Sequence, residues 1–367
     1  QEQKQEQKQE QKQEQKQEKK NDKKESNKVL FFVAGTNKPW NYTYAKNNAL
    51  GGSEKAVVYL SYEFAKLMKD KEIIIGGQVQ EENVIIETEN ETGQVIKYVN
   101  MQTLKQLLDE YKFDTIIISR FLDFFNIYDG FECNNLILYQ HDTAFHPYDN
   151  KGANILQGNI ERVDYIINLT DWHMNNTIEN YPFLKDYTSK FKIINNGICP
   201  ELFLNKKETK VRNSFVFTSR PERGLHRLLD LWTDITEQIP DATLKISSYD
   251  TLSDEYIDKI NKFNNVEFLG ELNTDDLYNL TRQSEYWLYP TSWKETSCIT
   301  AMEMLASDVI CLYYPLAGLI NTIGDYGIQI KEGNEVDTLL GLTEKQKNEI
   351  KKRGKKYALE CSWENRA

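Results

Sequence analysis

From residue 29 onward, short runs of apolar residues alternate with stretches in which apolar residues recur at helical spacing. Val29–Ala34 is a wholly apolar run, and Ser53–Met68 places apolar side chains three and four positions apart. Runs that are apolar on both faces predict parallel strands that helices cover on both sides. The first half of the chain therefore predicts an α/β domain. Its other predicted strands are Ile73–Ile75, Thr115–Ser119, Leu136–Tyr139 and Tyr165–Leu169, and its other predicted helices are Thr103–Tyr111 and Trp172–Asn180.

The same alternation starts again near Ser214. Turn-forming residues in the segment Ile193–Phe203 separate the two cycles. We therefore predict two Rossmann-like domains, 29–198 and 199–367, with a cleft between them that holds the ligand. The second domain's predicted strands are Phe215–Thr218, Leu244–Ser247, Val266–Leu269, Tyr286–Tyr289 and Val309–Tyr313, and its predicted helices run through residues 225–232, 274–283 and 300–306.

Residues 1–28 have a different composition, in which Gln, Glu and Lys repeat with a period of four. A helix would place Glu2, Glu6 and Glu10 in one row, where like charges four residues apart repel each other. The repeat has no apolar face to dock against a domain. It predicts a disordered low-complexity tail, with a coiled or partner-bound helix as the alternative.

Composition narrows the classes of function and location. The formal net charge of −11 argues against a nucleic-acid partner, which requires a basic surface. No run of 18 apolar residues is present, so no transmembrane segment is predicted. The five scattered cysteines favour neither a disulfide framework nor a zinc site and fit a reducing, cytoplasmic compartment. Because the first residue is Gln rather than Met, we expect a piece of a longer chain, which could carry an upstream signal.

The first candidate site is Gly51-Gly52-Ser53-Glu54, at the start of a predicted helix. Two glycines allow a ligand to approach the backbone closely, and Ser53 is a candidate cap. The free N–H groups and the dipole of the helix would then form an anion site. The alternative is an ordinary glycine turn before a capped helix.

The second candidate is the loop Ser219–Gly224, which joins a predicted strand to a predicted helix. It carries Arg220 and Arg223, and arginine offers planar, permanently charged donors that suit a diphosphate. The alternative is a pair of surface arginines.

The third candidate is a pair of carboxylates, Glu295 and Glu303, around the start of a predicted helix. The first precedes the helix and the second lies about one and a half turns inside it. Carboxylates accept hydrogen bonds from pairs of hydroxyls, which suits a sugar and a ribose. A solvated helix face is the alternative.

The fourth candidate is His141, which directly follows the predicted strand Leu136–Tyr139. A histidine at this end of a strand can donate to a sugar hydroxyl or to a developing charge. A structural histidine held by Asp142 is the alternative. The sequence contains no Asp-x-Asp triplet, no G-x-x-x-x-G-K-[ST] loop and no G-x-G-x-x-G motif, which disfavours a metal-diphosphate clamp, a P-loop nucleotidase and dinucleotide redox chemistry.

In this order and spacing, the motifs resemble family 4 retaining glycosyltransferases of the GT-B fold. Gly51–Glu54 is similar to that family's glycine loop, and Lys192–Ile198 to its interdomain Asn-Gly turn. Ser219–Leu225 and Pro290–Glu303 are similar to its diphosphate and E-x7-E motifs, in the S-R-P-E-R-G-L and E-T-S-C-I forms of one subgroup. Trp363 stands where the family's last helix starts to cross back to the first domain.

The resemblance implies transfer of a sugar from a nucleotide-diphosphate-sugar donor to an acceptor hydroxyl, with retention of configuration. It implies no cofactor and no metal, and it leaves open a glycan, lipid or protein acceptor. Two alternatives remain, a catalytically silent sugar-nucleotide-binding or scaffold protein and a GT-B nucleotide-sugar epimerase. The domain 29–198 would face the acceptor and 199–367 would bind the donor.

The resemblance also implies individual roles. Arg220 and Arg223 would neutralise the diphosphate, Glu295 would bind hydroxyls of the transferred sugar, and Glu303 would bind the ribose. His141 would contact the sugar near the reacting carbon. The remaining implied donor-binding groups are the phosphate cradle made by the backbone N–H groups of Ser297, Cys298 and Ile299, and the glycines Gly51 and Gly52, which would let the first domain close over the diphosphate.

Acceptor binding is expected in variable loops of the first domain, Thr36–Asn48 and Ala144–Gly158. Their aromatic residues could stack on a sugar ring or could be ordinary surface residues. These residues are Trp40, Tyr42, Tyr44 and Phe145.

Overall fold

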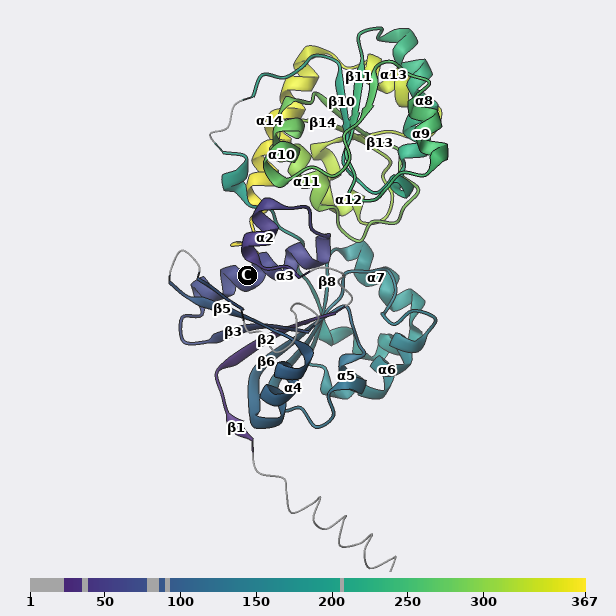
Figure 1. Cartoon of the computed structure of the whole chain (residues 1–367). Helices are drawn as coiled ribbons and strands as arrows, with labels where there is room; N and C mark the ends of the chain where they lie inside the picture. Colours follow the sequence, from purple (N-terminus) through teal and green to yellow (C-terminus); the bar gives the residue numbers. More distant parts are fainter. Residues whose placement is uncertain (1–22, 35–38, 78–85, 90–92, 205–207) are drawn as a thin grey trace, which may run out of the picture.

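The computed structural model describes residues 23–34, 39–77, 86–89, 93–204 and 208–367 of the chain. It consists of two α/β domains stacked end to end (Figure 1). The predicted tail lies outside the described residues up to residue 22. Among the described residues, no helix combines the length and the apolar character that crossing a membrane requires.

The first domain is built on a nine-stranded sheet. Its strands are β1 (Lys24–Glu25), β2 (Lys28–Val33), β3 (Glu72–Gly77), β4 (Ile86–Glu89), β5 (Val95–Val99), β6 (Tyr111–Ser119), β7 (Cys133–Tyr139), β8 (Tyr165–Asn168) and β9 (Phe191–Ile193). The order is β4-β5-β3-β2-β6-β7-β8-β9, with β1 beside β6. Only the β4–β5 pair is antiparallel among these described strands. The helices are α2 (Tyr42–Asn47), α3 (Gly52–Leu67), α4 (Met101–Glu110), α5 (Phe124–Ile127), α6 (Lys151–Asn159) and α7 (Asp171–Asn180), with 3-10 helices at Ile160–Arg162 and Pro182–Lys190.

The second domain has a six-stranded parallel sheet in the order β12-β11-β10-β13-β14-β15. Its strands are β10 (Ser214–Phe217), β11 (Thr243–Ile246), β12 (Val266–Phe268), β13 (Tyr286–Tyr289), β14 (Ile310–Tyr313) and β15 (Ile328–Gln329). Its helices are α8 (Leu225–Gln238), α9 (Asp254–Ile260), α10 (Thr274–Gln283), α11 (Ile299–Ala306), α12 (Leu319–Thr322), α13 (Glu335–Leu340) and α14 (Glu344–Glu360), with 3-10 helices at Pro200–Leu202, Pro221–Arg223 and Gly324–Tyr326. In Figure 1, α8 and α9 cover one face of the sheet, and α10, α11 and α14 lie toward the other.

The strand order reverses between β10 and β13, because the chain builds outward from β10 to β12 and then returns to the other side. Ligands of open α/β sheets bind beyond the carboxyl ends of the strands at such a switch point. The loops that follow β10 and β13 carry Arg220, Arg223 and Glu295. The topology therefore places three of the predicted site residues at one edge of one sheet.

The ordered chain begins earlier than the sequence predicts. Disorder was expected through residue 28, but Lys24–Glu25 pairs with β6 and Lys28 opens β2. The charged side chains of this segment form ion pairs with opposite charges on the first domain. Lys24 pairs with Glu110 at 2.6 Å, and Lys112 pairs with Glu25 at 2.9 Å.

The C-terminal segment returns to the first domain where Ser362 forms a bridge with Ile198, and residues 364–366 then form a turn. The helix α14 ends at Glu360 and packs against α11 within the second domain. The Ile198 N–H then donates to the Cys361 carbonyl at 2.8 Å, and the Trp363 N–H donates to the Ile198 carbonyl at 3.1 Å. The Trp363 ring stacks on Tyr59 of α3 with centroids 6.2 Å apart.

Candidate active site

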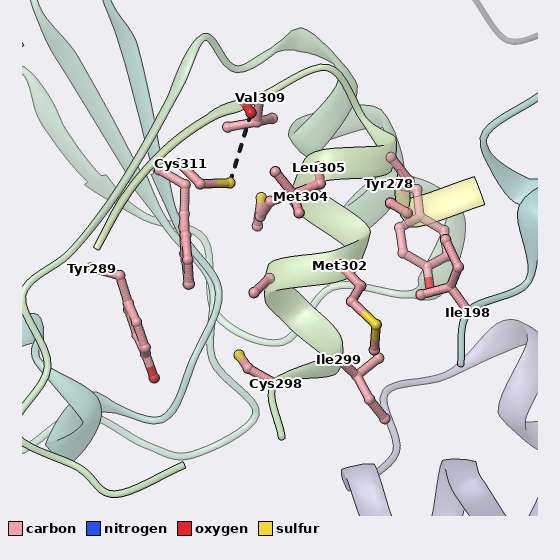
Figure 2. Close-up of a cluster of buried hydrophobic side chains, with 14 of the residues drawn as sticks. Ile198, Tyr278, Tyr289, Cys298, Ile299, Met302, Met304, Leu305, Val309 and Cys311 are labelled. Atoms are coloured by element: carbon pink, nitrogen blue, oxygen red, sulfur yellow. Dashed lines mark hydrogen bonds between the residues drawn. The ribbon is translucent and has the colours of Figure 1, made fainter. Parts of the chain in front are cut away.

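The helix α11 forms the centre of the candidate site. Figure 2 shows it passing between Tyr289 and Cys311 on one side and Tyr278 on the other, with Cys298 and Ile299 at its N-terminal end. Seven of its eight residues are buried, including Glu303. Because apolar packing fixes the helix on several sides, the two carboxylates that it positions, Glu295 and Glu303, have little freedom. Both are more than nine-tenths buried, which excludes the alternative of a solvated helix face.

Glu295 is held by two donors from the second domain. Its Oε1 accepts from Tyr289 Oη at 2.9 Å and from Arg223 Nη1 at 3.2 Å. Burial raises the pKa of Glu295, whereas Arg223 and the Tyr289 hydrogen bond pull that pKa down. The Arg223 guanidinium also lies over the Trp293 ring, 5.3 Å from its centroid. The Glu295 carboxylate and the Arg223 guanidinium therefore lie side by side at the point where the strand order reverses.

A glycine fixes the backbone of the loop that carries Glu295. The Gly318 N–H donates to the Glu295 carbonyl at 2.8 Å. A Cβ at Gly318 would lie 2.4 Å from the Thr296 carbonyl oxygen and 2.7 Å from the Glu295 carbonyl oxygen. No side chain fits there unless the loop moves.

Glu303 connects the two domains. Its Oε1 accepts from Tyr278 Oη at 2.7 Å, and from Lys55 Nζ, on α3 of the first domain, at 3.2 Å. Lys55 was not among the predicted site residues. Nothing in the sequence links a lysine at 55 with a glutamate 248 positions later.

The N-termini of α3 and α11 lie close together across the domain junction. Gly51 is the N-cap of α3, and a Cβ on Gly52 would lie 3.7 Å from Cδ1 of Ile299, the first residue of α11. The N–H groups at the start of a helix have no intrahelical acceptor, so two helix ends present donors and positive dipoles to one region. The expected capping role of Ser53 is wrong, because Ser53 lies inside α3 and its hydroxyl donates to Glu54 Oε2 at 2.9 Å.

His141 is buried beside this junction. Its ring packs on Tyr139 with centroids 4.1 Å apart, and its Nε2 has no hydrogen-bond partner among the described residues. Burial, together with nearby Arg120 and His173, lowers the pKa of His141 well below its usual value, so the imidazole is neutral at pH 7. The alternative of a histidine held by Asp142 is wrong: the Asp142 carboxylate accepts from Arg120 Nε at 2.7 Å.

Thr296, next to Glu295, makes two hydrogen bonds to the first domain. Its hydroxyl donates to the His141 carbonyl at 2.7 Å, and its carbonyl accepts from Thr170 Oγ1 at 2.8 Å. Thr170 is also the N-cap of α7, where it accepts from the His173 N–H. The loop of one carboxylate is thereby attached to the strand end that carries His141.

Arg220 lies at the edge of this group. Its Nε donates to Asp250 at 2.7 Å and lies 3.0 Å from Glu222 Oε1, and its side chain is 43% exposed. Neither Asp250 nor Glu222 contacts Glu295 or Arg223 through a hydrogen bond or an ion pair among the described residues. The predicted phosphate contact of Arg220 remains a prediction that requires an exchange of these partners.

Arg120 is a further residue that the sequence did not single out. It follows β6 with a left-handed φ of 69°, which costs a non-glycine residue energy and persists where surrounding contacts hold it. Its guanidinium donates to Ser53 Oγ at 3.1 Å as well as to Asp142, and lies 3.6 Å from Glu54. It therefore ties the glycine loop to the strand end of His141.

The expected aromatic platform for an acceptor is only partly accessible. Trp40 and Phe145 are core residues, 2% and 1% exposed, so they cannot stack on a sugar. Trp40 packs edge-on against Tyr98, and Tyr42 stacks on Tyr62 with centroids 4.1 Å apart. Residues 36–38 of the expected loop lie outside the described residues.

Taken together, the junction offers helix-end donors for an anion, a cation beside a buried carboxylate, a second buried carboxylate and a neutral histidine with one free ring nitrogen. This set suits a ligand that combines phosphate with hydroxyls. Within the described ranges, no three His, Cys, Asp or Glu side chains cluster so as to hold a metal ion.

Comparisons with known proteins agree with the fold. Residues 203–356 match the model of the family "Glycosyl transferases group 1". A search of the curated proteins gave no match.

Solved structures with this fold cover nearly the whole chain. A glycosyltransferase from Rickettsia africae has a TM-score of 0.66 at 13% identity, covering 93% of this chain and 95% of its own. Sucrose-phosphate synthase from Thermosynechococcus elongatus has a TM-score of 0.65 at 13% identity, and the match covers 92% of this chain and 96% of the synthase chain. Anabaena HepE in complex with UDP and glucose has a TM-score of 0.64 at 15% identity, and the match covers 91% of this chain and 95% of the HepE chain. The chain therefore has the GT-B fold of these enzymes, and its second domain matches the group 1 glycosyl transferases.

Proposed function

We propose that the protein is a glycosyltransferase that moves a sugar from a nucleotide-diphosphate donor to an acceptor hydroxyl, with retention of configuration and without a metal. One observation carries the proposal. Two buried carboxylates, Glu295 and Glu303, flank the N-terminus of α11 where it faces the N-terminus of α3. Burial of a carboxylate is costly unless hydrogen bonds and opposite charges compensate it, and here a polyhydroxyl ligand could take over part of that compensation from the present partners.

The donor diphosphate would bind between the two helix ends. The N–H groups of Ser297, Cys298 and Ile299 and those of Gly51 and Gly52 would donate to its oxygens. Arg223 would turn from Glu295 toward the phosphate, and Arg220 would exchange Asp250 for it. Charge on the leaving nucleotide would then be stabilised by preorganised donors in a partly water-excluded site, which is electrostatic catalysis.

The transferred sugar would replace Arg223 on Glu295, so that the carboxylate accepts from sugar hydroxyls. His141 would place its free Nε2 against the sugar near the reacting carbon, and its neutral state avoids repulsion with the arginines. No side chain stands out as an enzymic nucleophile. Retention would follow from displacement on the same face, assisted by the leaving phosphate.

Glu303 would bind the ribose of the nucleotide. In the structure its carboxylate accepts from Lys55, so ribose binding would displace or share this contact. The acceptor would approach from the first domain. HepE is known in complex with UDP-glucose, which makes UDP-glucose the first donor to test.

The test is turnover of nucleotide-sugar donors, starting with UDP-glucose, by purified protein in the presence of EDTA. Release of UDP, slow by hydrolysis or fast with an added acceptor, is expected from the wild type and should fall about 100-fold or more in Glu295→Gln. The anomeric configuration of the product, read by NMR, tests retention.

Glu335→Gln is the matched control. Glu335 is also a buried carboxylate held by an arginine and a tyrosine, Arg227 and Tyr314, but it lies away from the domain junction. Its variant should lose stability and keep turnover. Donor binding without turnover by any donor would instead favour the silent binding protein, and equal losses in both variants would refute the assignment of Glu295.

A further inference from the structure

A pocket of about 790 Å³ lies on the second domain, at the C-terminal end of α11. It is bounded by Ala306–Asp308, by α14 and by Phe203. Glu295 lies before the opposite end of α11, and the eight residues of this helix span about 12 Å. We call this the lysine pocket. Six basic residues line it, against the two acidic residues Glu208 and Asp308: Lys210, Arg282, Lys351, Lys352, Lys355 and Lys356.

Arg282 is a buried cation without a counter-ion. It is 5% exposed, and its guanidinium donates to the Leu202 carbonyl at 3.1 Å and to the Asn279 side chain. Its Nε is buried and has no hydrogen-bond partner, and no described carboxylate lies within ion-pair distance of the group. Burial of a charge is costly unless an opposite charge compensates it. An anion in the pocket would supply that compensation.

Three lysines of α14 add to this charge. Lys351, Lys352 and Lys356 make no hydrogen bond or ion pair with a described residue. By contrast, Lys355 pairs with Asp308, and Lys210 donates to the carbonyls of Ser284 and Ser307. The latter two therefore have structural partners, and the charge available to a ligand comes from the three free lysines and Arg282.

We propose that the lysine pocket binds a small polyanion that carries phosphate groups. Four uncompensated positive charges gather here in a chain whose formal net charge is −11, so the local excess is opposite to that of the molecule. Arginine provides a planar fork and lysine a mobile point charge, and both suit phosphate oxygens. The volume lies in the range of small-molecule sites. This site is separate from the donor site and does not depend on the proposed transferase activity.

The test is isothermal titration calorimetry with inorganic pyrophosphate at fixed ionic strength. The titration uses the full chain carrying Arg220→Gln and Arg223→Gln, which weakens the proposed donor site. Its backbone N–H groups remain, so the lysine variants assign the binding to one pocket or the other. We expect pyrophosphate to bind this protein at one site. Adding Lys351→Gln, Lys352→Gln and Lys356→Gln should weaken that binding about tenfold or more.

The matched control removes three exposed lysines elsewhere, by Lys185→Gln, Lys262→Gln and Lys345→Gln, and should keep the affinity. Arg282→Gln should also weaken binding. Because this substitution could unfold the protein, the variant with the three lysine substitutions is the decisive test. Absence of pyrophosphate binding, or equal weakening in both triple variants, would overturn the proposal. So would sedimentation with phosphatidylglycerol vesicles in the absence of pyrophosphate binding, which would point to a lipid headgroup.

Discussion

Lys55 on α3 and Glu303 on α11 form an ion pair of 3.2 Å that joins the two domains through side chains 16% and 10% exposed. Water screens a pair this buried only weakly, so the two charges couple more strongly than those of a surface ion pair, whereas their desolvation offsets part of the gain in net stability. The same carboxylate is the proposed ribose ligand. One carboxylate therefore contributes to the contact between the domains and to the proposed donor site.

A double-mutant cycle measures this pair. Lys55→Met and Glu303→Gln are each expected to destabilise the protein, and the coupling energy between them should be about 1–3 kcal/mol. Urea unfolding of the four proteins gives the value. A coupling energy near zero would mean that the two side chains do not interact in solution.

Gly318→Ala tests whether the backbone position of the Glu295 loop controls activity. The new Cβ would clash with the carbonyl oxygens of Glu295 and Thr296, so the loop backbone must move. Because a displacement of about 1 Å can cost about 100-fold in rate, we expect a loss of that order at a temperature where the variant is still folded, together with a lower melting temperature from the backbone clash. Gly158→Ala, where a Cβ meets nothing within 4 Å, is the control and should keep full activity.

His173 makes the stability of the first domain depend on pH. It accepts from the Leu169 N–H at Nδ1 and contacts the Asp142 carbonyl through Nε2, and burial lowers its pKa to about 4. Between pH 6.5 and 4 the unfolded chain binds a proton that the folded chain does not, so stability falls as the pH falls. The loss attributable to this group is up to about 3 kcal/mol.

Comparison of urea unfolding at pH 7.5 and pH 4.5 checks this. His173→Gln should be less stable at pH 7.5 and should show a smaller decrease at pH 4.5 than the wild type. A decrease as large as that of the wild type would assign the pH dependence to other groups.

Trp363→Ala tests the return of the C-terminal segment to the first domain. The ring is 3% exposed and stacks on Tyr59, so its removal should cost about 3 kcal/mol. Trp293→Ala, which removes a 44% exposed ring, should cost less than about 1 kcal/mol. Equal costs in chemical denaturation would show that the segment is not docked in solution.

The sequence predicted the elements whose burial is continuous or whose ends are capped. The helix α10 matches the prediction at both ends, because the Asn273 side chain caps it and a polar break follows Gln283. The helix α14 was not predicted. Among its residues only Gly354 and Ala358 are buried, so its sequence lacks the row of apolar residues at helical spacing from which a helix is predicted. The two-residue strand β1 was not predicted, because its two charged residues are held on β6 by strand pairing and ion pairs that form only in the folded domain.

The candidate site was predicted where motifs lie within one domain and was incomplete where it depends on both. Glu295 and Arg223 were named and lie together. Lys55, Arg120 and Thr296 act through partners more than 20 positions away. Their identities, a lysine, an arginine and a threonine, are common at any surface, so only the folded arrangement reveals what they contact.

The two hydrogen bonds of Thr296 have a consequence for protein engineering. Its hydroxyl donates to the His141 carbonyl and its carbonyl accepts from Thr170, both in the first domain. The conformation of the Glu295 loop therefore depends on contacts with this particular first domain. A chimera that joined this second domain to the first domain of another protein would lose the contact from the Thr170 side chain unless a hydroxyl stood there, whereas the contact to a backbone carbonyl at position 141 depends only on the backbone position. Such a recombinant would therefore need a hydroxyl at position 170 and a backbone at position 141 that follows the same path, in addition to a compatible fold.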